Sequence, residues 1–249
     1  MSSKQLLLTT VYISLIIQVI TGVVSLYGVF IPLKPKDKIL NDVILIETIV
    51  QFIEGAWYVY IAYAMYSIQN DTIASRRYID WVITTPIMLL STILFMEYES
   101  ERVIHKAVIT TKEVILNNMT DLTLIFIYNF FMLAFGFFGE IHKLNKYLSI
   151  PMGFLFFFLA FYNIWENFAY KTVVTRRLFY FLFVVWGAYG LAAMMPVIPK
   201  NIIYNCLDII SKNFYGLYIF YKILQVKESY KTPKYKYTNT PMEYEIFYT

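Results

Sequence analysis

The sequence predicts an all-α membrane protein, a bundle of seven transmembrane helices. Of its 249 residues, 59% are hydrophobic and only 15% are charged, whereas a soluble domain usually carries about 25% charged residues. Seven apolar segments, each long enough to cross a bilayer, account for most of the chain. In lipid such segments must be helices because their backbone finds no water to bond, and none alternates in polarity as a barrel strand does.

The seven predicted helices follow one another with short connections. They run over residues 5–31, 40–66, 76–97, 118–139, 147–170, 175–197 and 199–225. The stretch 98–117 is too charged to span, and we expect it to lie at the cytoplasmic surface. Residues 1–226 therefore form one predicted domain. Residues 227–249, rich in Lys, Tyr and Thr, form a predicted polar tail.

Basic residues predict the orientation of the bundle. Lysine and arginine gather after the first, third and fifth helices and in the C-terminal tail. This bias favours an integral, multi-pass protein with its N-terminus outside and its C-terminus in the cytoplasm. The net charge of +4 gives no reason to expect a nucleic-acid partner. With one cysteine and two scattered histidines, we expect no metal site.

Five ionisable residues lie well inside the predicted spans, where a charge is costly and usually functional. They are Glu47, Glu54, Asp80, Asp208 and Lys212. Asp208 and Lys212 are four residues apart, so they share one face of the last helix. One interpretation is a structural Lys–Asp ion pair. The other is that a desolvated lysine forms a Schiff base with a carbonyl compound.

The third predicted helix favours the Schiff base. At about 100° per residue, Asp80, Thr84 and Ser91 fall on one polar line. Arg77 lies one turn before Asp80 on nearly the same face. A second carboxylate that faces the bundle interior needs a cation. Lys212 bearing a protonated Schiff base is the candidate, with Asp80 and Asp208 as its counterions.

The motifs around these residues resemble those of the microbial rhodopsins. Residues 77–86, Arg-Tyr-Ile-Asp-Trp-Val-Ile-Thr-Thr-Pro, are similar to the third-helix signature of that family. Asp208-xxx-Lys212 is similar to its retinal-attachment helix, and residues 135–140 and 203–205 resemble segments of proteorhodopsins. The resemblance covers helices two to seven. It implies a seven-helix bundle of the microbial rhodopsin type that carries all-trans retinal as a Schiff base on Lys212.

The resemblance also implies the walls of a retinal pocket. The implied wall residues are Trp81, Thr85, Met88, Trp186 and Tyr189. Gly190 stands where the family usually has a proline, and Ala193 stands where related pumps often have an aromatic residue. We therefore expect the sixth helix to bend differently and the pocket to be looser there. The apolar Met88 suggests green rather than blue absorption.

By resemblance, the residues at positions 80, 84 and 91 distinguish the transport functions found in the family. Asp80 would accept the Schiff-base proton after photoisomerisation, and Thr84 would hydrogen-bond to Asp80. Ser91 stands where outward proton pumps of the family carry a carboxylate. A serine hydroxyl is far too weak an acid to supply a proton at neutral pH. This weakens the pump interpretation without excluding it, whereas the chloride-pump and sodium-pump patterns do not fit.

A second polar stripe runs along the second predicted helix. Glu47, Gln51, Glu54 and Tyr58 fall on one face of it, and the first helix offers Ser14 in a similar polar stripe. Hydrogen bonding between helices is the simpler interpretation for Ser and Gln. Two glutamates two turns apart, with no arginine nearby to neutralise them, instead suit a hydrated cation path.

Channelrhodopsins supply a further resemblance. Glu54 aligns with their gate glutamate, Glu47 with another second-helix glutamate, and Asn213 with the gate asparagine after the retinal lysine. By a looser alignment, Ser14 matches their gate serine. The predicted ion path comprises Ser14, Glu47, Gln51, Glu54, Asn205 and Asn213. Asp-Thr-Ser together with second-helix glutamates is most similar to the viral rhodopsins of giant viruses of algae.

These features predict a light-gated cation channel, a photoreceptor rather than an enzyme. Monovalent cations or protons would pass between helices one, two, three and seven. One alternative is an outward proton pump with slow reprotonation. Another is a sensory rhodopsin that signals to a partner. The lipid bilayer is an expected partner, and assembly into a homo-oligomer is left open.

Overall fold

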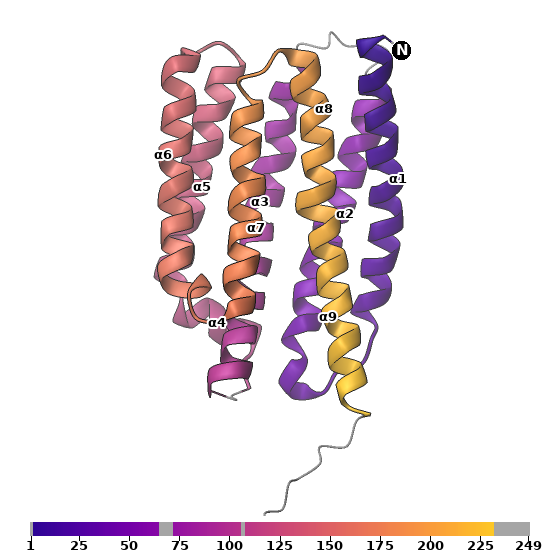
Figure 1. Ribbon diagram of the computed structural model, residues 1–249, viewed down its shortest axis with the longest axis vertical. Coiled ribbons are helices and arrows are strands. Elements are labelled where there is room, and N and C mark those ends of the chain that lie inside the picture. The colour runs from indigo at the N-terminus through magenta and orange to yellow at the C-terminus, as the bar shows by residue number, and fades with distance from the viewer. Residues whose placement is uncertain (1, 65–71, 106–107, 232–249) are drawn as a thin grey trace, which may run out of the picture.

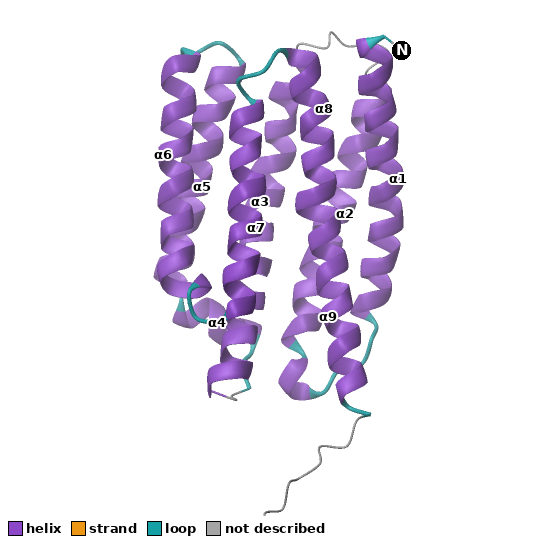
Figure 2. Ribbon diagram, viewed as in Figure 1, coloured by secondary structure: helices purple, strands orange, loops and turns teal. Residues whose placement is uncertain are grey.

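All regular structure in the described part of the chain is helical. The computed structural model describes residues 2–64, 72–105 and 108–231, and Figure 2 shows helices joined by short loops. Seven long rods stand side by side (Figure 1). The chain enters at one end of the bundle, here called the N-terminal end, and the last rod finishes at the opposite end. The predicted seven-helix bundle is confirmed.

The rods follow the predicted segments in order. The first six are α1 (Ser3–Val29), α2 (Ile39–Ala64), α3 (Ile73–Ser100), α5 (Met119–Glu140), α6 (Lys146–Ile164) and α7 (Val173–Ala192). The seventh rod consists of α8 (Val197–Asp208), a π-helical turn (Ile209–Phe214) and α9 (Tyr215–Ser229). The predicted ends differ most clearly at α7, which stops at Ala192 instead of residue 197. The last rod also continues past the expected domain boundary at residue 226.

The surface of the bundle is apolar and its interior is partly polar. On α1, Ile16 and Val23 are exposed, whereas Gln18 and Thr21 are buried. This arrangement is the reverse of a soluble helix and fits a helix surrounded by lipid. Within the described residues, four segments are long and apolar enough to cross a membrane by themselves: Ser3–Val29, Ile73–Ile104, Met119–Glu140 and Lys146–Ala169.

We expected the stretch 98–117 to lie at the surface, but part of it is buried. Its first residues, Tyr98 to Ser100, are buried because α3 continues into the bundle end. A π-helical turn (Glu101–His105) follows, and then α4 (Thr111–Asn117) begins with a capping box. The side chain and backbone of Thr110 both donate hydrogen bonds to Glu113, and these bonds hold the pKa of the Glu113 carboxyl below its ordinary value.

Candidate functional site

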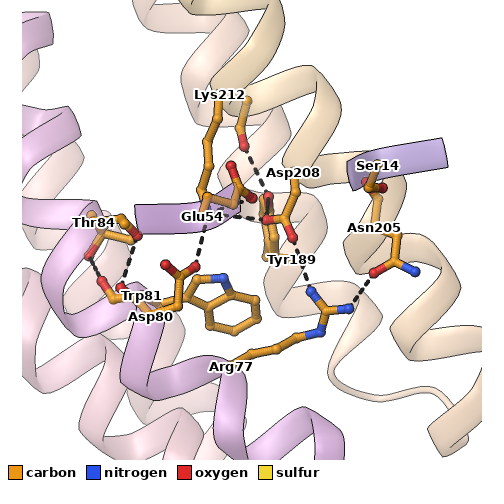
Figure 3. Close-up of polar contacts among 12 residues, drawn as sticks. Ser14, Glu54, Arg77, Asp80, Trp81, Thr84, Tyr189, Asn205, Asp208 and Lys212 are labelled. Atoms are coloured by element: carbon orange, nitrogen blue, oxygen red, sulfur yellow. Dashed lines mark hydrogen bonds and ion pairs between the residues drawn. The ribbon is translucent and has the colours of Figure 1, made fainter. Parts of the chain in front are cut away.

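Lys212 lies at the centre of the bundle with three carboxylates around its ammonium group (Figure 3). Its Nζ is 2.9 Å from Oε1 of Glu54, 3.2 Å from Oδ2 of Asp80 and 3.5 Å from Oδ1 of Asp208. Lys212 belongs to the π-helical turn that interrupts the last rod, an irregularity frequent at functional sites. The structure thus brings both expected counterions to Lys212 and adds Glu54, whose contact with Lys212 the sequence reasoning missed.

Glu54 therefore does not lack a neutralising cation, which corrects the expectation for the second helix. No arginine lies near it in sequence, but Lys212 supplies the charge from the last rod, which packs beside α2. Glu54 is completely buried. A buried carboxylate without a cation would be unstable as an ion, so this pair explains one of the two second-helix glutamates.

Both carboxylate oxygens of Asp208 accept hydrogen bonds. Its Oδ2 accepts hydrogen bonds from Arg77 Nη1 at 3.0 Å and from the Tyr58 hydroxyl at 2.7 Å, and its Oδ1 accepts one from the Tyr189 hydroxyl at 2.7 Å. The guanidinium of Arg77 is fully buried and also contacts Asn201 and Asn205. Hydrogen bonds and an ion pair of this kind stabilise the ionised form of a carboxylate.

Asp80 has far fewer partners than Asp208. Its Oδ2 contacts Lys212, and its Oδ1 has no hydrogen-bond partner among the described residues. We expected the hydroxyl of Thr84 to bond the Asp80 carboxylate. It donates instead to the Asp80 backbone carbonyl at 3.0 Å. Threonine in a helix commonly bonds the carbonyl four residues back. Asp80 is therefore the carboxylate better placed to take up a proton.

A cavity extends from Lys212 between α3, α5, α6 and α7. The space not filled by atoms is about 790 Å³, part of which is open to the surroundings. All five expected wall residues line it: Trp81, Thr85, Met88, Trp186 and Tyr189. The sequence reasoning missed the walls from α5 and α6, which include Met132, Leu133, Gly136, Gly153 and Phe154. Their sequence pattern does not distinguish them from lipid-facing residues.

We expected Gly190 to leave the cavity looser at α7, but it does not. The ring of Phe154 from α6 packs against it, so that a Cβ at position 190 would lie 2.6 Å from Phe154 Cζ. No flexible end of a side chain is involved, because a whole aromatic ring fills the space. The small residue therefore permits a close approach of two helices.

A polar network links α1, α2 and the last rod next to Lys212. Gln18 donates from Nε2 to Oε2 of Glu54, the oxygen that does not face Lys212. Asn213 donates to Oε1 of Gln18 at 3.0 Å and to Oε1 of Gln51 at 2.9 Å. The structure thus brings Gln51, Glu54 and Asn213 together as predicted. It adds Gln18, whose signal was its place in the polar stripe of the first helix.

Ser14 bonds the backbone of the last rod instead of Glu54 or Asn213 in the described structure, and its place in that gate stays a prediction. Its hydroxyl donates to the backbone carbonyl of Asn205 at 3.2 Å, and Figure 3 shows Ser14 beside Asn205. The side chain of Asn205 contacts Arg77 and Tyr58. Ser14 and Gln18 share a face but lie one turn apart, and the short serine side chain does not span that rise.

Glu47 forms a separate contact farther along α2. Its Oε1 accepts a hydrogen bond from Ser91, and its Oε2 has no partner among the described residues. Beyond it, towards the opposite end of the bundle, a buried apolar cluster closes the interior with Val43, Ile44 and Ile93. The polar residues therefore form no continuous path to that end in this conformation.

The opposite end is closed by a second group of contacts. The carboxylate of Asp37, in the connection after α1, accepts hydrogen bonds of 2.7 Å from Tyr98 and from Tyr230. Burial and the bond to Asp37 raise the pKa of Tyr230 to about 12, so this phenol remains a donor at neutral pH. These bonds connect the α1–α2 connection to α3 and to the end of the last rod.

Comparisons with known proteins agree with this architecture. Residues 9–226 match the family model described as bacteriorhodopsin-like protein. The viral rhodopsin OLPVRII is 27% identical, with a TM-score of 0.78, and the match covers 89% of this chain and 99% of that chain. Xanthorhodopsin, a light-driven ion pump with dual chromophore, is 16% identical over 91% of this chain and 96% of that chain, with a TM-score of 0.71.

Halorhodopsin from Halobacterium salinarum is another similar structure. It is 11% identical over 91% of this chain and 97% of its own, with a TM-score of 0.69. At these identities, xanthorhodopsin and halorhodopsin show the fold alone. No curated protein matches this chain in the sequence comparison.

Proposed function

The chain belongs to the bacteriorhodopsin-like family of retinal proteins. We propose that it functions as a light-gated cation channel. Glu54 is the observation that carries the proposal. One of its carboxylate oxygens binds Lys212, and the other accepts from Gln18 in the polar network. A change of charge on Lys212 therefore reaches α1, α2 and the last rod through a single side chain.

Retinal fits the cavity that ends at Lys212. The family binds it as a Schiff base to a lysine, and Lys212 is the lysine that lines this apolar, aromatic-walled cavity. Trp81, Trp186 and Tyr189 would hold the chromophore. When bound, retinal supplies the absorption of light and the isomerisation that starts the cycle.

Asp80 is the proposed proton acceptor. Its Oδ2 lies 3.2 Å from Lys212 Nζ, within reach of a direct proton transfer. Asp208 is instead bound by Arg77 and two tyrosine hydroxyls. Transfer from Nζ to Asp80 removes the positive charge that Glu54 pairs with. The hydrogen bond between Gln18 and Glu54 then changes in strength. We propose that this step opens the gate.

The chemistry of the path favours cations. Between α1, α2, α3 and the last rod, the buried polar groups include five carboxylates and amides: Gln18, Glu47, Gln51, Glu54 and Asn213. Carboxylates and oxygen dipoles attract cations and repel anions. Arg77 with Asp208 would form an electrostatic barrier towards the N-terminal end. The apolar cluster beyond Glu47 must separate or hydrate before ions pass.

Orientation remains part of the proposal. The excess of lysine and arginine in the connections at the opposite end of the bundle supports a cytoplasmic location for that end. Cations would then enter from outside near Arg77 and leave past Glu47. Protease or antibody access to an epitope tag placed after residue 249 distinguishes the two orientations.

Photocurrents under voltage clamp test the proposed function. Glu54→Gln keeps the size of the side chain and removes its charge, so we expect a changed ion selectivity or a changed current. Glu166→Gln alters an exposed glutamate outside the network and is the matched control. Photocurrents that keep one sign at every membrane potential would contradict a channel.

An outward proton pump is the second candidate, and the contact between Glu47 and Ser91 favours it. Ser91 cannot supply a proton, but Glu47 places a buried carboxyl at the same level of the bundle. It would reprotonate Lys212 from the cytoplasmic side. Light-driven external acidification, abolished by a protonophore and by Asp80→Asn and slowed by Glu47→Gln, would support a pump.

A further inference from the structure

One buried carboxylate ties the end of the last rod to the α1–α2 connection. Asp37 ends the short 3-10 turn Pro35–Asp37 of that connection and is 4% exposed. Its Oδ1 accepts a hydrogen bond from the Tyr98 hydroxyl of α3, and its Oδ2 accepts one from the Tyr230 hydroxyl, both at 2.7 Å. Asp37 therefore joins three parts of the chain that are far apart in sequence.

Tyr230 is the residue through which the last rod makes this contact. It is the C-cap of α9, and its hydroxyl also accepts a hydrogen bond of 3.2 Å from the Lys34 backbone N–H. The Lys34 ammonium lies 4.6 Å from the centre of the Tyr230 ring. The other polar contacts described for residues 225–231 stay within the rod. In the described structure, the phenol of Tyr230 is thus the polar link between this rod end and the α1–α2 connection.

The link lies directly beyond the apolar cluster that closes the interior. This cluster includes Ile223 and Val226 of the last rod and Ile44 of α2. Tyr230 follows Val226 by about one turn of helix. An ion path to this end of the bundle requires water between these apolar side chains, so α9 and α2 must move apart there. That movement would pull Tyr230 away from Asp37.

We propose that the Asp37–Tyr230 hydrogen bond is a latch, which holds α9 against α2 in the dark and releases while ions pass. The inference rests on the proposed channel function and adds the contact that keeps its far end shut. Tyr98 stays bound to the other carboxylate oxygen, so Asp37 keeps its place beside α3 and takes Tyr230 back when the channel closes. Losing a hydrogen bond to a carboxylate shifts such an equilibrium by roughly tenfold to a hundredfold.

Tyr230→Phe tests the latch with the smallest change. It removes the hydroxyl and keeps the ring beside Lys34, so the photocurrent should decay about tenfold more slowly after the light is switched off. The visible absorption band should not move, since Tyr230 lies about 27 Å from Lys212 along the last rod at 1.5 Å per residue. Tyr221→Phe is the matched control and should leave the decay unchanged, because its hydroxyl bonds Gln225 of the same rod.

Asp37→Asn tests the pairing itself. It keeps the size of the side chain and removes the charge, so it should also slow the decay. The double variant with Tyr230→Phe should decay no more slowly than the slower single variant, because both changes act on one bond. Fully additive slowing would assign the two effects to separate contacts and overturn the latch.

Hydrogen–deuterium exchange of the natural sequence tests the movement without a current. The backbone N–H of Lys34 is a direct reporter, since it donates to the Tyr230 hydroxyl. In the retinal-bound protein in lipid vesicles, continuous light should speed exchange in residues 33–41 at least several-fold. Tyr230→Phe should exchange fast there already in the dark. A merely structural contact would give the same exchange in light and dark.

The two measurements separate the latch from the channel. Light-dependent exchange in residues 33–41 without any photocurrent would refute the channel and leave the latch standing. Equal exchange in light and dark, or an unchanged decay in Tyr230→Phe, would overturn the latch even where channel currents are present.

Discussion

Replacing Gln18 by leucine tests the gate most sharply. Gln18 is the one side chain that joins Glu54 of α2 to Asn213 of the last rod in the described structure. Leucine has a similar volume and no polar atoms, so Gln18→Leu removes both hydrogen bonds without leaving a large cavity. The substitution leaves the contact between Glu54 and Lys212 in place.

The size of the effect follows from the two bonds. A hydrogen bond to a charged group contributes about 1.5–3 kcal/mol, and one between neutral groups contributes about 0.5–1.5 kcal/mol. Losing both would destabilise the closed state by about 2–4 kcal/mol. Since about 1.4 kcal/mol corresponds to a factor of ten, the ratio of open to closed channels would rise roughly 30-fold to 1,000-fold.

Photocurrent decay after the light is switched off measures this shift. We expect Gln18→Leu to close at least tenfold more slowly than the natural sequence and to show a current in the dark. Ser14→Ala is the matched control, since it removes one hydrogen bond on the same face of α1 but outside the network. Unchanged closing in Gln18→Leu, or slower closing in Ser14→Ala than in Gln18→Leu, would refute the assignment of the gate.

Three further predictions concern the chromophore and the stability of the bundle. Lys212→Ala should abolish visible absorbance after reconstitution with retinal; a retained visible band would show that retinal is attached elsewhere. Gly190→Ala should destabilise the protein by about 1–3 kcal/mol through its clash with Phe154, whereas Gly55→Ala, with nothing within 4 Å, should not; thermal unfolding compares them. Glu140→Gln should cost about 3 kcal/mol by breaking the buried pair with Lys200, measured in the same assay.

The sequence predicts the rods and their order well because both depend on local properties. Apolar length sets each span, and the backbone must be helical in lipid. Residues on one face of one helix are also predictable, as Gln51 and Glu54 show. The end of α7 is less predictable, since the apolar residues from Ala193 to Met195 continue the pattern while the chain already turns.

Contacts between rods depend on their relative depth and rotation, which periodicity does not give. Glu54 and Lys212 are 158 residues apart in sequence, and only the assembled bundle brings them to 2.9 Å. Ser14 and Gln18 have the same periodicity, so nothing local distinguishes the one that reaches Glu54. The unequal roles of Asp80 and Asp208 likewise follow from the partners that other helices bring to each carboxylate.

The reversal potential of the photocurrent tests the central claim most directly. External monovalent salt is diluted tenfold with sucrose, and the membrane potential at which the photocurrent changes sign is recorded before and after. A cation channel predicts a shift to more negative potential of up to about 59 mV, the value for a tenfold gradient of a singly charged ion. A photocurrent that never changes sign, or a shift to more positive potential, would contradict it.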